Sequence, residues 1–402
     1  MSRDTAWEQR WRGTLAERQA QGLYRRPRLL ECRDGVHARL EGRDCLVFCS
    51  NDYLGLADHP VISAALAQAA SEVGTGSGAA HLISGHHREH EALESELADW
   101  VGRPRALLFS TGYMANMGVI NALAEPGDTV FEDVLNHASL LDGGWLSRGR
   151  MQRYAHGDVA ALDAALAQTS GRALIATDAV FSMDGDLAPL PALAELAARR
   201  EALLVVDDAH GFGVLGNGPG SVAHFGLTPD QVPVYIGTLG KALGTFGAFV
   251  AGSETLIDYL IQRARTYIYT TAPPPALAAA TRAALGLARQ DAWRREHLVD
   301  LVTRFRDGAR RLGLPLMASD TPIQPLWVGD AARAMALGAA LLEAGYWVTP
   351  IRPPTVPPGT ARLRITLTAA HTPGQVEGLL GALAHCLDAP AGAPELRCAE
   401  DG

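Results

Sequence analysis

The sequence predicts an α/β protein, with a large domain built on a mostly parallel central sheet and a smaller α+β domain after it. Between about residues 61 and 251, short apolar runs alternate with stretches of helical spacing. Apolar runs without polar alternation are typical of strands covered on both faces, as in a parallel sheet with crossover helices. The chain of 402 residues is also longer than one hydrophobic core usually accommodates. We therefore expect two folded domains.

The expected elements follow in chain order. Residues 7–21 combine many charges with apolar residues at helical spacing, which predicts an exposed helix. Residues 46–49 are a short strand signal, followed by a turn-rich run. Strands of the large domain are expected at 106–109, 129–131, 173–176, 203–206 and 234–236.

The C-terminal part predicts a smaller domain of mixed type. A long helical stretch is expected from about 276 to 312, and the later strands are expected at 323–328, 346–349 and 362–367. We place an N-terminal helix and short strand in residues 1–50, the large domain in 51–285 and the small domain in 286–389. Residues 390–402 are rich in Pro, Gly and Ala, which predicts a flexible tail.

Composition excludes several classes of function. The net charge of −9 and the short basic clusters make nucleic acid a poor partner. No apolar run reaches about 18 residues, and the first residues are polar where a signal peptide has an apolar core, so we expect no membrane partner and a cytoplasmic location. The five cysteines are odd in number and lack paired C-x-x-C spacing, which predicts reduced thiols and no zinc site.

Two residues placed after strands indicate pyridoxal 5'-phosphate. Asp207 ends an apolar run, and Lys241 lies on a later loop flanked by glycines. This cofactor needs a carboxylate against its protonated pyridine nitrogen and a lysine that forms an imine with its aldehyde. Taken alone, an aspartate such as Asp207 more often caps a helix or ends a strand, and Lys241 could be a surface lysine. His210 could reach the phenolic oxygen of the same ring, which favours the cofactor.

Other residues could complete such a site. Gly112 and Tyr113 follow a strand and open a helix, so their N–H groups could cradle a phosphate, although a bare strand-to-helix turn explains them equally well. Thr238 adds a hydroxyl on the same side. His137 could stack on the ring, although a lone histidine is more often structural. Arg352 stands before two prolines, and a stiffly held guanidinium can bind a carboxylate with two hydrogen bonds.

Three motifs imitate other sites, and we expect no metal at any of them. The run 181–186 (FSMDGD) lacks the closing bidentate Glu of a calcium loop, so Ser182 is better interpreted as a hydroxyl donor to the cofactor's phenolic oxygen. Residues 86–90 (HHREH) lack the Glu of H-E-x-x-H, which favours a polar helix face over zinc. The G-x-G-x-x-G at 211–216 continues into N-G-P-G, which cannot begin a dinucleotide-binding helix.

In this order and over nearly the whole chain, the motifs resemble the α-oxoamine synthase family, pyridoxal phosphate enzymes of fold type I with the aspartate aminotransferase type of fold. Nine matches in order are not expected by chance. The matching runs are 50–56 (SNDYLGL), 76–78 (GSG), 110–113 (STGY), 136–139 (NHAS), 180–186 (VFSMDGD), 207–211 (DDAHG), 238–241 (TLGK), 269–271 (YTT) and 352–355 (RPPT).

The resemblance implies roles for these residues. Lys241 would hold the cofactor as an imine and then act as general base at the α-carbon, while Asp207 pairs with the pyridinium. His137 would stack on the ring and is a candidate to stabilise the thioester oxyanion. Ser182 and His210 would bind the phenolic oxygen.

The phosphate would be held by Gly112, Tyr113 and Thr238, with Thr270 and Thr271 reaching it from the other subunit. The implied active unit is therefore a homodimer whose active site lies at the subunit interface.

The runs 351–357 and 359–371 are most similar to the members that join L-alanine to a pimeloyl thioester, of coenzyme A or of an acyl carrier protein, in the biotin pathway. His81 stands where glycine-using relatives usually have Arg, which argues against glycine. The implied substrate-binding residues are Arg25 (or its neighbour Arg26), Asn51, His137, Arg352 and Thr355. The alternatives are 2-amino-3-oxobutyrate CoA ligase, 5-aminolevulinate synthase or a serine palmitoyltransferase-like enzyme, a plain aminotransferase, and a non-enzymatic protein that retains the fold.

Overall fold

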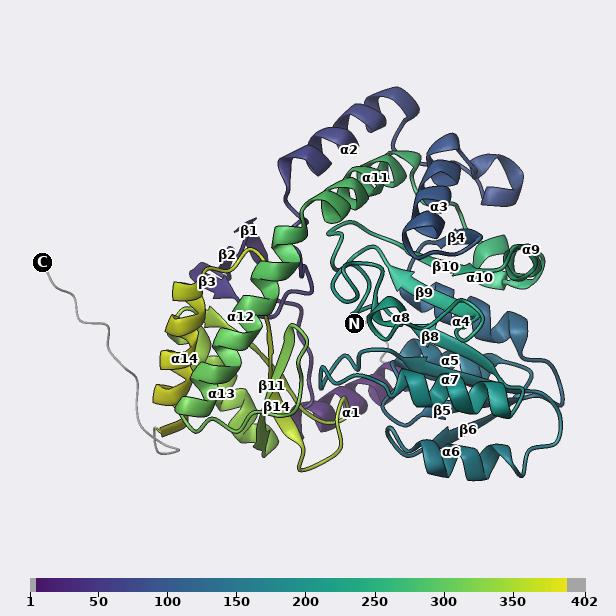
Figure 1. Ribbon diagram of the computed structural model, residues 1–402. Coiled ribbons are helices and arrows are strands. Elements are labelled where there is room, and N and C mark those ends of the chain that lie inside the picture. Colours follow the sequence, from purple (N-terminus) through teal and green to yellow (C-terminus); the bar gives the residue numbers. More distant parts are fainter. Residues whose placement is uncertain (1–4, 389–402) are drawn as a thin grey trace, which may run out of the picture.

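A seven-stranded sheet forms the centre of the large part of the molecule in the computed structural model, which describes residues 5–388 (Figure 1). The strand order is β4-β10-β9-β8-β7-β5-β6. The pairs from β6 through β9 are parallel, whereas β10 is antiparallel to both β4 and β9, so the mostly parallel sheet is confirmed. The strands are β4 (Arg105–Phe109), β5 (Thr129–Asp133), β6 (Arg150–Tyr154), β7 (Ala173–Asp178), β8 (Leu203–Asp207), β9 (Val234–Thr238) and β10 (Ala248–Gly252).

Both faces of this sheet are buried. On β8, Leu204 and Val206 belong to one apolar cluster while Val205 belongs to another, which explains why the strand shows no polar alternation. Strands β6 and β10 were not predicted; β6 lies at the sheet edge, where its sequence RMQRY is partly exposed. The helical elements of this part are α2 (Pro60–Val73), the π-helix η1 (His81–Gly85), α3 (Arg88–Trp100), α4 (Gly112–Leu123), α5 (Ala138–Leu146), α6 (Val159–Leu166), α7 (Leu190–Arg199), α8 (Ser221–His224), α9 (Glu254–Arg263) and α10 (Arg265–Ile268).

The C-terminal part combines helices with a three-stranded sheet of order β11-β14-β13. Helix α11 (Pro275–Gln290) packs against α2 and α3 of the large part (Figure 1). The elements of the C-terminal part are α12 (Ala292–Arg311), β11 (Ile323–Gly329), α13 (Ala331–Glu343), β12 (Tyr346–Trp347), β13 (Thr349–Ile351), β14 (Ala361–Thr366) and α14 (Pro373–Asp388). The single helical stretch expected from 276 to 312 is wrong, because the backbone of Asp291 leaves the helical region at φ −88° and ψ 64°. The result is two helices.

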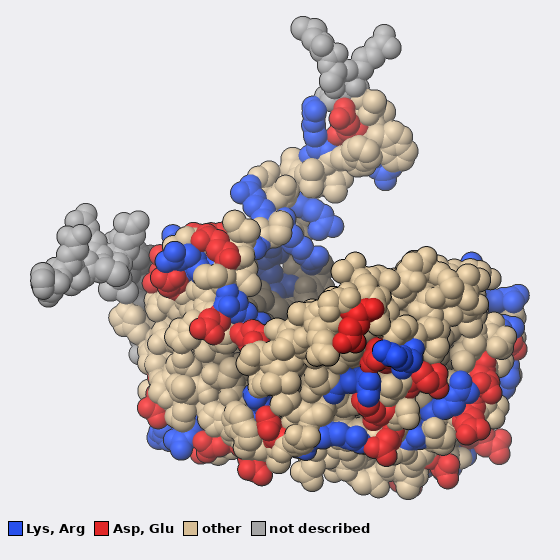
Figure 2. Space-filling view, turned by 90° about the horizontal axis from the view of Figure 1, so that it is seen from above, with Lys and Arg blue, Asp and Glu red and all other residues tan. Residues whose placement is uncertain are grey.

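The N-terminal segment is tied to the C-terminal part. It contains α1 (Ala6–Ala20), β1 (Leu30–Asp34), β2 (His37–Leu40) and β3 (Arg43–Val47). The strand expected at 346–349 divides, and its first half, β12, pairs in parallel with β3. Helix α1 buries no residue, as its sequence predicted, and Figure 2 shows the N-terminal segment standing away from the body as an arm with Arg side chains along it.

None of the helices formed by residues 5–388 is long and apolar enough to cross a membrane. The flexible tail predicted for 390–402 lies outside the described residues.

Candidate active site

The carboxyl ends of three neighbouring parallel strands gather the residues predicted to bind the cofactor. Asp207 is the last residue of β8, and it lies opposite Asp178 at the end of β7. Thr238 ends β9, three residues before Lys241. Ligands of open parallel sheets bind in the crevice outside these strand ends. The fold thus places the predicted residues where such a sheet binds its ligand.

Lys241 begins a series of three hydrogen-bonded side chains. Its Nζ lies 3.0 Å from Nε2 of His210, and Nδ1 of His210 lies 2.6 Å from Oη of Tyr53. Burial lowers the pKa of Lys241 to about 8 and the pKa of His210 well below its usual value. A lysine with a depressed pKa supplies a neutral, nucleophilic amine closer to neutral pH than an ordinary lysine does.

Asp207 is a buried carboxylate that lacks a cation. Its Oδ1 accepts the N–H of Ala209 at 2.9 Å, and its Oδ2 accepts Nδ2 of Asn116 at 2.6 Å. Within residues 5–388, no basic side chain makes an ion pair with it. A buried charge is costly unless it is paired, and a pyridinium nitrogen would supply the missing partner. This carboxylate therefore fits pyridoxal phosphate.

His137 caps helix α5 beside this carboxylate. Its backbone N–H donates to Oδ2 of Asp178 at 2.6 Å. Its Nδ1 lies 2.7 Å from Oγ of Ser139 and accepts the Ser139 N–H at 3.3 Å. The residue is open to solvent on one side, while the protein packed around the ring lowers the pKa of His137 by desolvation. An exposed, neutral, firmly held ring suits a flat ligand that stacks on it.

The start of α4 forms an anion cradle. Gly112 and Tyr113 are its first residues, so their N–H groups have no partner within the helix. A Cβ on Gly112 would lie 2.8 Å from Cγ2 of Thr238, so only glycine lets these two segments approach so closely. Helix N-termini of this kind bind phosphate. The predicted phosphate residues are therefore adjacent, and they too fit the cofactor.

Arg364 is the site residue that the sequence interpretation missed. It lies on β14 with only 6% of its surface exposed. Its Nε donates to the carbonyl of Ser182 at 2.6 Å, and its Nη2 donates to Oδ1 of Asn51 at 3.1 Å. No acidic side chain among the described residues pairs with it, so this buried guanidinium could receive an external carboxylate. The only sequence signal is a pair of arginines that alternate with apolar residues in the strand ARLRIT.

Tyr53 and Asn116 were missed as well. Tyr53 belongs to the run 50–56 that carries the resemblance, yet only the folded chain brings it to His210. Asn116 lies in the second turn of α4 and follows the anion motif, and nothing in its local sequence links it to Asp207.

Several predicted residues do not meet this group within one chain. Arg25 lies exposed in the N-terminal segment, and Arg26 beside it stacks over the ring of Tyr24 at 5.5 Å. Arg352 is half-buried and donates only to the carbonyl of Pro353, at 3.5 Å. The other members of this set are Thr270, which is half-buried, and Thr271 and Thr355, which are exposed.

The interpretation of residues 86–90 as a polar helix face is wrong for His90. This residue is fully buried, accepts the N–H of His87 with Nδ1 at 3.0 Å, and donates from Nε2 to the carbonyl of Pro273 at 2.8 Å. It completes the capping box of α3. His81 and His86 lie beside it, with their Nδ1 atoms 2.9 Å apart.

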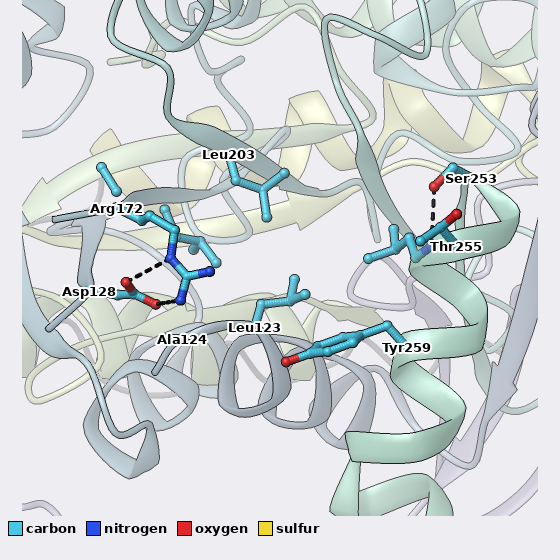
Figure 3. A pocket seen from close by; sticks show the side chains of 11 residues that line it. Leu123, Ala124, Asp128, Arg172, Leu203, Ser253, Thr255 and Tyr259 are labelled. Atoms are coloured by element: carbon cyan, nitrogen blue, oxygen red, sulfur yellow. Dashed lines mark hydrogen bonds and ion pairs between the residues drawn. The ribbon is translucent and has the colours of Figure 1, made fainter. Parts of the chain in front are cut away.

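A separate hollow of about 430 Å³ lies at the opposite end of the sheet (Figure 3). Its lining includes Ala173 and Leu203, which begin β7 and β8, and the ion pair between Arg172 and Asp128 at 3.1 Å. The cofactor residues stand where these strands end, so this hollow is a different place.

Residues 43–383 match the family model for class I and II aminotransferases. A protein of Alkalilimnicola ehrlichii named 8-amino-7-oxononanoate synthase is 62% identical over 376 residues, which are 93% of this chain and 96% of that protein. A protein of Nitrosococcus oceani with the same name is 61% identical over 375 residues, 93% of this chain and 100% of that protein.

Solved structures agree with these relatives. A variant of serine palmitoyltransferase from S. paucimobilis with a bound PLP–myriocin aldimine has a TM-score of 0.89 and 30% identity, covering 94% of this chain and 97% of that one. An 8-amino-7-oxononanoate synthase from Francisella tularensis has a TM-score of 0.75 and 31% identity, covering 85% of this chain and 98% of that one. These findings confirm the fold type and the resemblance drawn from the motifs. The chain belongs to the class I and II aminotransferase family, and within that family it groups with the 8-amino-7-oxononanoate synthases.

Proposed function

We propose that the protein condenses L-alanine with a pimeloyl thioester to give 8-amino-7-oxononanoate, carbon dioxide and a free thiol, in biotin biosynthesis, with pyridoxal 5'-phosphate as cofactor. The acyl carrier is coenzyme A or an acyl carrier protein. Identities near 60% over nine-tenths of the chain support this reaction. The single observation that carries it in the structure is an amine of lowered pKa, Lys241, grouped with an unpaired buried carboxylate, Asp207, and an unpaired buried guanidinium, Arg364.

The cofactor, when bound, supplies an aldehyde for covalent attachment and a ring that accepts the electron pair left at the α-carbon. Lys241 would hold it through Nζ until the amino group of the substrate displaces the lysine, and the freed Nζ would then take the α-proton, for which a pKa of about 8 is suited. Asp207 keeps the ring nitrogen protonated by direct ion pairing. Gly112, Tyr113 and Thr238 bind the phosphate.

His210, the neighbour of Lys241, would bind the cofactor ring at its phenolic oxygen. His210 is neutral because burial depresses its pKa, and Tyr53 fixes its orientation through Nδ1. Its Nε2, now 3.0 Å from Lys241, is then positioned for the phenolic oxygen, together with the hydroxyl of Ser182. A neutral imidazole and a hydroxyl bind this oxygen without adding a second cation beside Lys241.

The amino-acid carboxylate binds Arg364, which the carbonyl of Ser182 and the amide of Asn51 hold in place. Arg352 and Thr355 bind the acyl substrate from the loop after β13, and Arg25 contributes from the N-terminal segment. In this assignment the buried Arg364 binds the small amino acid, and the more exposed Arg352, Thr355 and Arg25 bind the long acyl thioester.

The active unit is a homodimer with Thr270 and Thr271 of one subunit at the phosphate of the other. Large apolar side chains near them support this proposal: Ile83 is 80% exposed and Tyr269 is 71% exposed, more than a surface without a partner usually leaves together. Ile83 lies in η1 and Tyr269 directly follows α10. These two elements are neighbours, because His81 of η1 stacks on Tyr267 of α10 with ring centroids 4.9 Å apart. The proposed location is the cytoplasm.

Turnover assays test the reaction. We expect thiol release, carbon dioxide and a product of the mass of 8-amino-7-oxononanoate with L-alanine and pimeloyl-CoA or pimeloyl carrier protein. Glycine or serine should give far less, as should acetyl-CoA or palmitoyl-CoA. Efficient condensation of glycine or serine would assign the chain to another oxoamine synthase. Amino transfer to an oxo acid without thiol release would assign it to the plain aminotransferases.

A further inference from the structure

One buried amide connects Asp207, which is proposed to pair with the cofactor nitrogen, to His137, which is proposed to stack on the cofactor ring. Asn116 is 1% exposed, and its Nδ2 lies 2.6 Å from Oδ2 of Asp207 and 2.8 Å from Oγ of Ser139. Oγ of Ser139 in turn lies 2.7 Å from Nδ1 of His137. None of the roles assigned so far includes Asn116 or Ser139.

The directions of these hydrogen bonds follow from their chemistry. An ionised carboxylate only accepts, so the atom of Asn116 that faces Asp207 is the amide nitrogen. This nitrogen carries two hydrogens, one for Asp207 and one for Oγ of Ser139. The hydroxyl of Ser139 therefore accepts from Asn116, and its own hydrogen is left for Nδ1 of His137.

The same logic fixes the protonation of His137. Its Nδ1 receives both the hydroxyl and the backbone N–H of Ser139, so Nδ1 must offer a lone pair. A neutral imidazole whose Nδ1 is an acceptor carries its proton on Nε2. Desolvation lowers the pKa of His137, which favours this neutral ring over the imidazolium. Asp178 holds the backbone of the same residue.

We propose that Asn116 is a positioning residue that sets His137, through Ser139, as a neutral Nε2–H hydrogen-bond donor, and that it holds Asp207 for the cofactor nitrogen at the same time. This inference rests on the proposed placement of the ring, with its nitrogen at Asp207 and one face on His137. A ring donor on Nε2 stabilises the oxyanion that forms when the thioester carbonyl is attacked. It cannot take a proton from substrate at that atom, so Lys241 alone acts as base.

The first test measures the tautomer without cofactor or substrate. In apoprotein labelled with nitrogen-15 histidine, the signals of His137, assigned from a His137→Gln variant, should be pyridine-like at Nδ1 and pyrrole-like at Nε2. Ser139→Ala should weaken this preference, because only the backbone N–H at 3.3 Å remains to donate to Nδ1, and Ser139→Thr should restore it. Ser147→Ala is the matched control, since that hydroxyl at the end of α5 donates only to the carbonyl of Gly144. A proton on Nδ1 in the wild type, or an unchanged tautomer in Ser139→Ala, would overturn the proposal.

The second test concerns Asn116 itself. Asn116→Leu removes the hydrogen bond from the amide to the carboxylate of Asp207. Because Asp207 is then held less firmly for the cofactor nitrogen, the dissociation constant of pyridoxal phosphate should rise by roughly 10- to 100-fold, the value of one hydrogen bond to a charged group. The same variant should also weaken the tautomer preference of His137. Asn121→Leu is the control, because this half-buried residue of the same helix bonds only the carbonyl of Leu146. Unchanged cofactor affinity in folded Asn116→Leu would refute the role; should that variant not fold, the Ser139 pair decides.

The tautomer and cofactor-affinity measurements test the role of Asn116 independently of the proposed reaction, which is tested by turnover. A protein that shows the Nε2–H tautomer but does not condense alanine with a pimeloyl thioester would retain the positioning role and lose the assigned substrates.

Discussion

Nζ of Lys241 and Nε2 of His210 lie 3.0 Å apart, and from this contact a continuous set of hydrogen bonds leads to the small domain. His210 contacts the hydroxyl of Tyr53, and this hydroxyl also contacts Oδ1 of Asn51. The same oxygen of Asn51 accepts a hydrogen bond from the guanidinium of Arg364. The lysine of the large domain and the guanidinium of β14 are thus held in one framework. Because both ends face the amino-acid substrate in the proposed site, their separation is fixed before the substrate arrives.

The attachment point of the cofactor is the first prediction. Borohydride reduction of the holoprotein followed by peptide mapping should place the pyridoxyl group on Lys241. Lys241→Ala should abolish turnover and leave the circular dichroism spectrum unchanged, and Lys241→Arg, which keeps the charge but lacks the nucleophile, should be equally inactive. Full activity of Lys241→Ala would contradict the mechanism.

Attachment of the cofactor should depend on pH in a way set by Lys241. Burial lowers the pKa of this amine from 10.5 to about 8, so the reactive neutral form increases as the pH rises and is nearly complete above about pH 9. The rate at which apoprotein takes up pyridoxal phosphate, followed by absorbance, should rise with pH and level off near pH 9. An inflection near 10.5 would show an ordinary lysine instead.

Local sequence signals sufficed for some of this site. Asp207 follows a buried apolar strand and Lys241 lies between glycines, and each pattern is visible within ten residues. Arg364 is different, since its partner Asn51 is 313 residues away in the chain. A contact of that kind depends on how the small domain docks, which no local pattern encodes.

The fold divides in the same way. The buried strands β7, β8 and β9 were predicted because both of their faces are apolar. The break at Asp291 was not, because helical spacing continues on both sides of it. The pairing of β12 with β3 also escaped prediction, since a two-residue strand has no periodicity to detect.

Replacement of Arg364 and replacement of Arg352 should raise the KM for different substrates. Arg364→Gln removes a buried guanidinium, and hydrogen bonds to a charged group make the KM for L-alanine rise by roughly 10- to 100-fold. Arg352→Gln, on the loop after β13, should instead affect the KM for the pimeloyl thioester. The reverse pattern would assign the amino-acid carboxylate to Arg352 and not to Arg364.

The last prediction concerns stability and pH at His156. Its Nδ1 lies 3.0 Å from Oδ1 of Asp133 and its Nε2 lies 2.8 Å from Oδ2 of Asp186, on the loop that carries Ser182. Hydrogen bonds first to Asp133 and then to Asp186 raise the pKa of His156 to about 10. A raised folded-state pKa stabilises the protein fully below the unfolded value of 6.5, and this contribution declines until it is lost near pH 10.

Urea unfolding of wild type and His156→Asn measures this contribution. The difference in the free energy of unfolding should be largest at pH 6 and should decrease steadily towards pH 10. His224→Gln is the control, because this exposed histidine has no acidic partner among the described residues and its replacement should give no such slope. A constant difference between pH 6 and pH 10 would mean that His156 acts through packing against Phe181, whose ring centroid lies 4.4 Å away, and not through its charge.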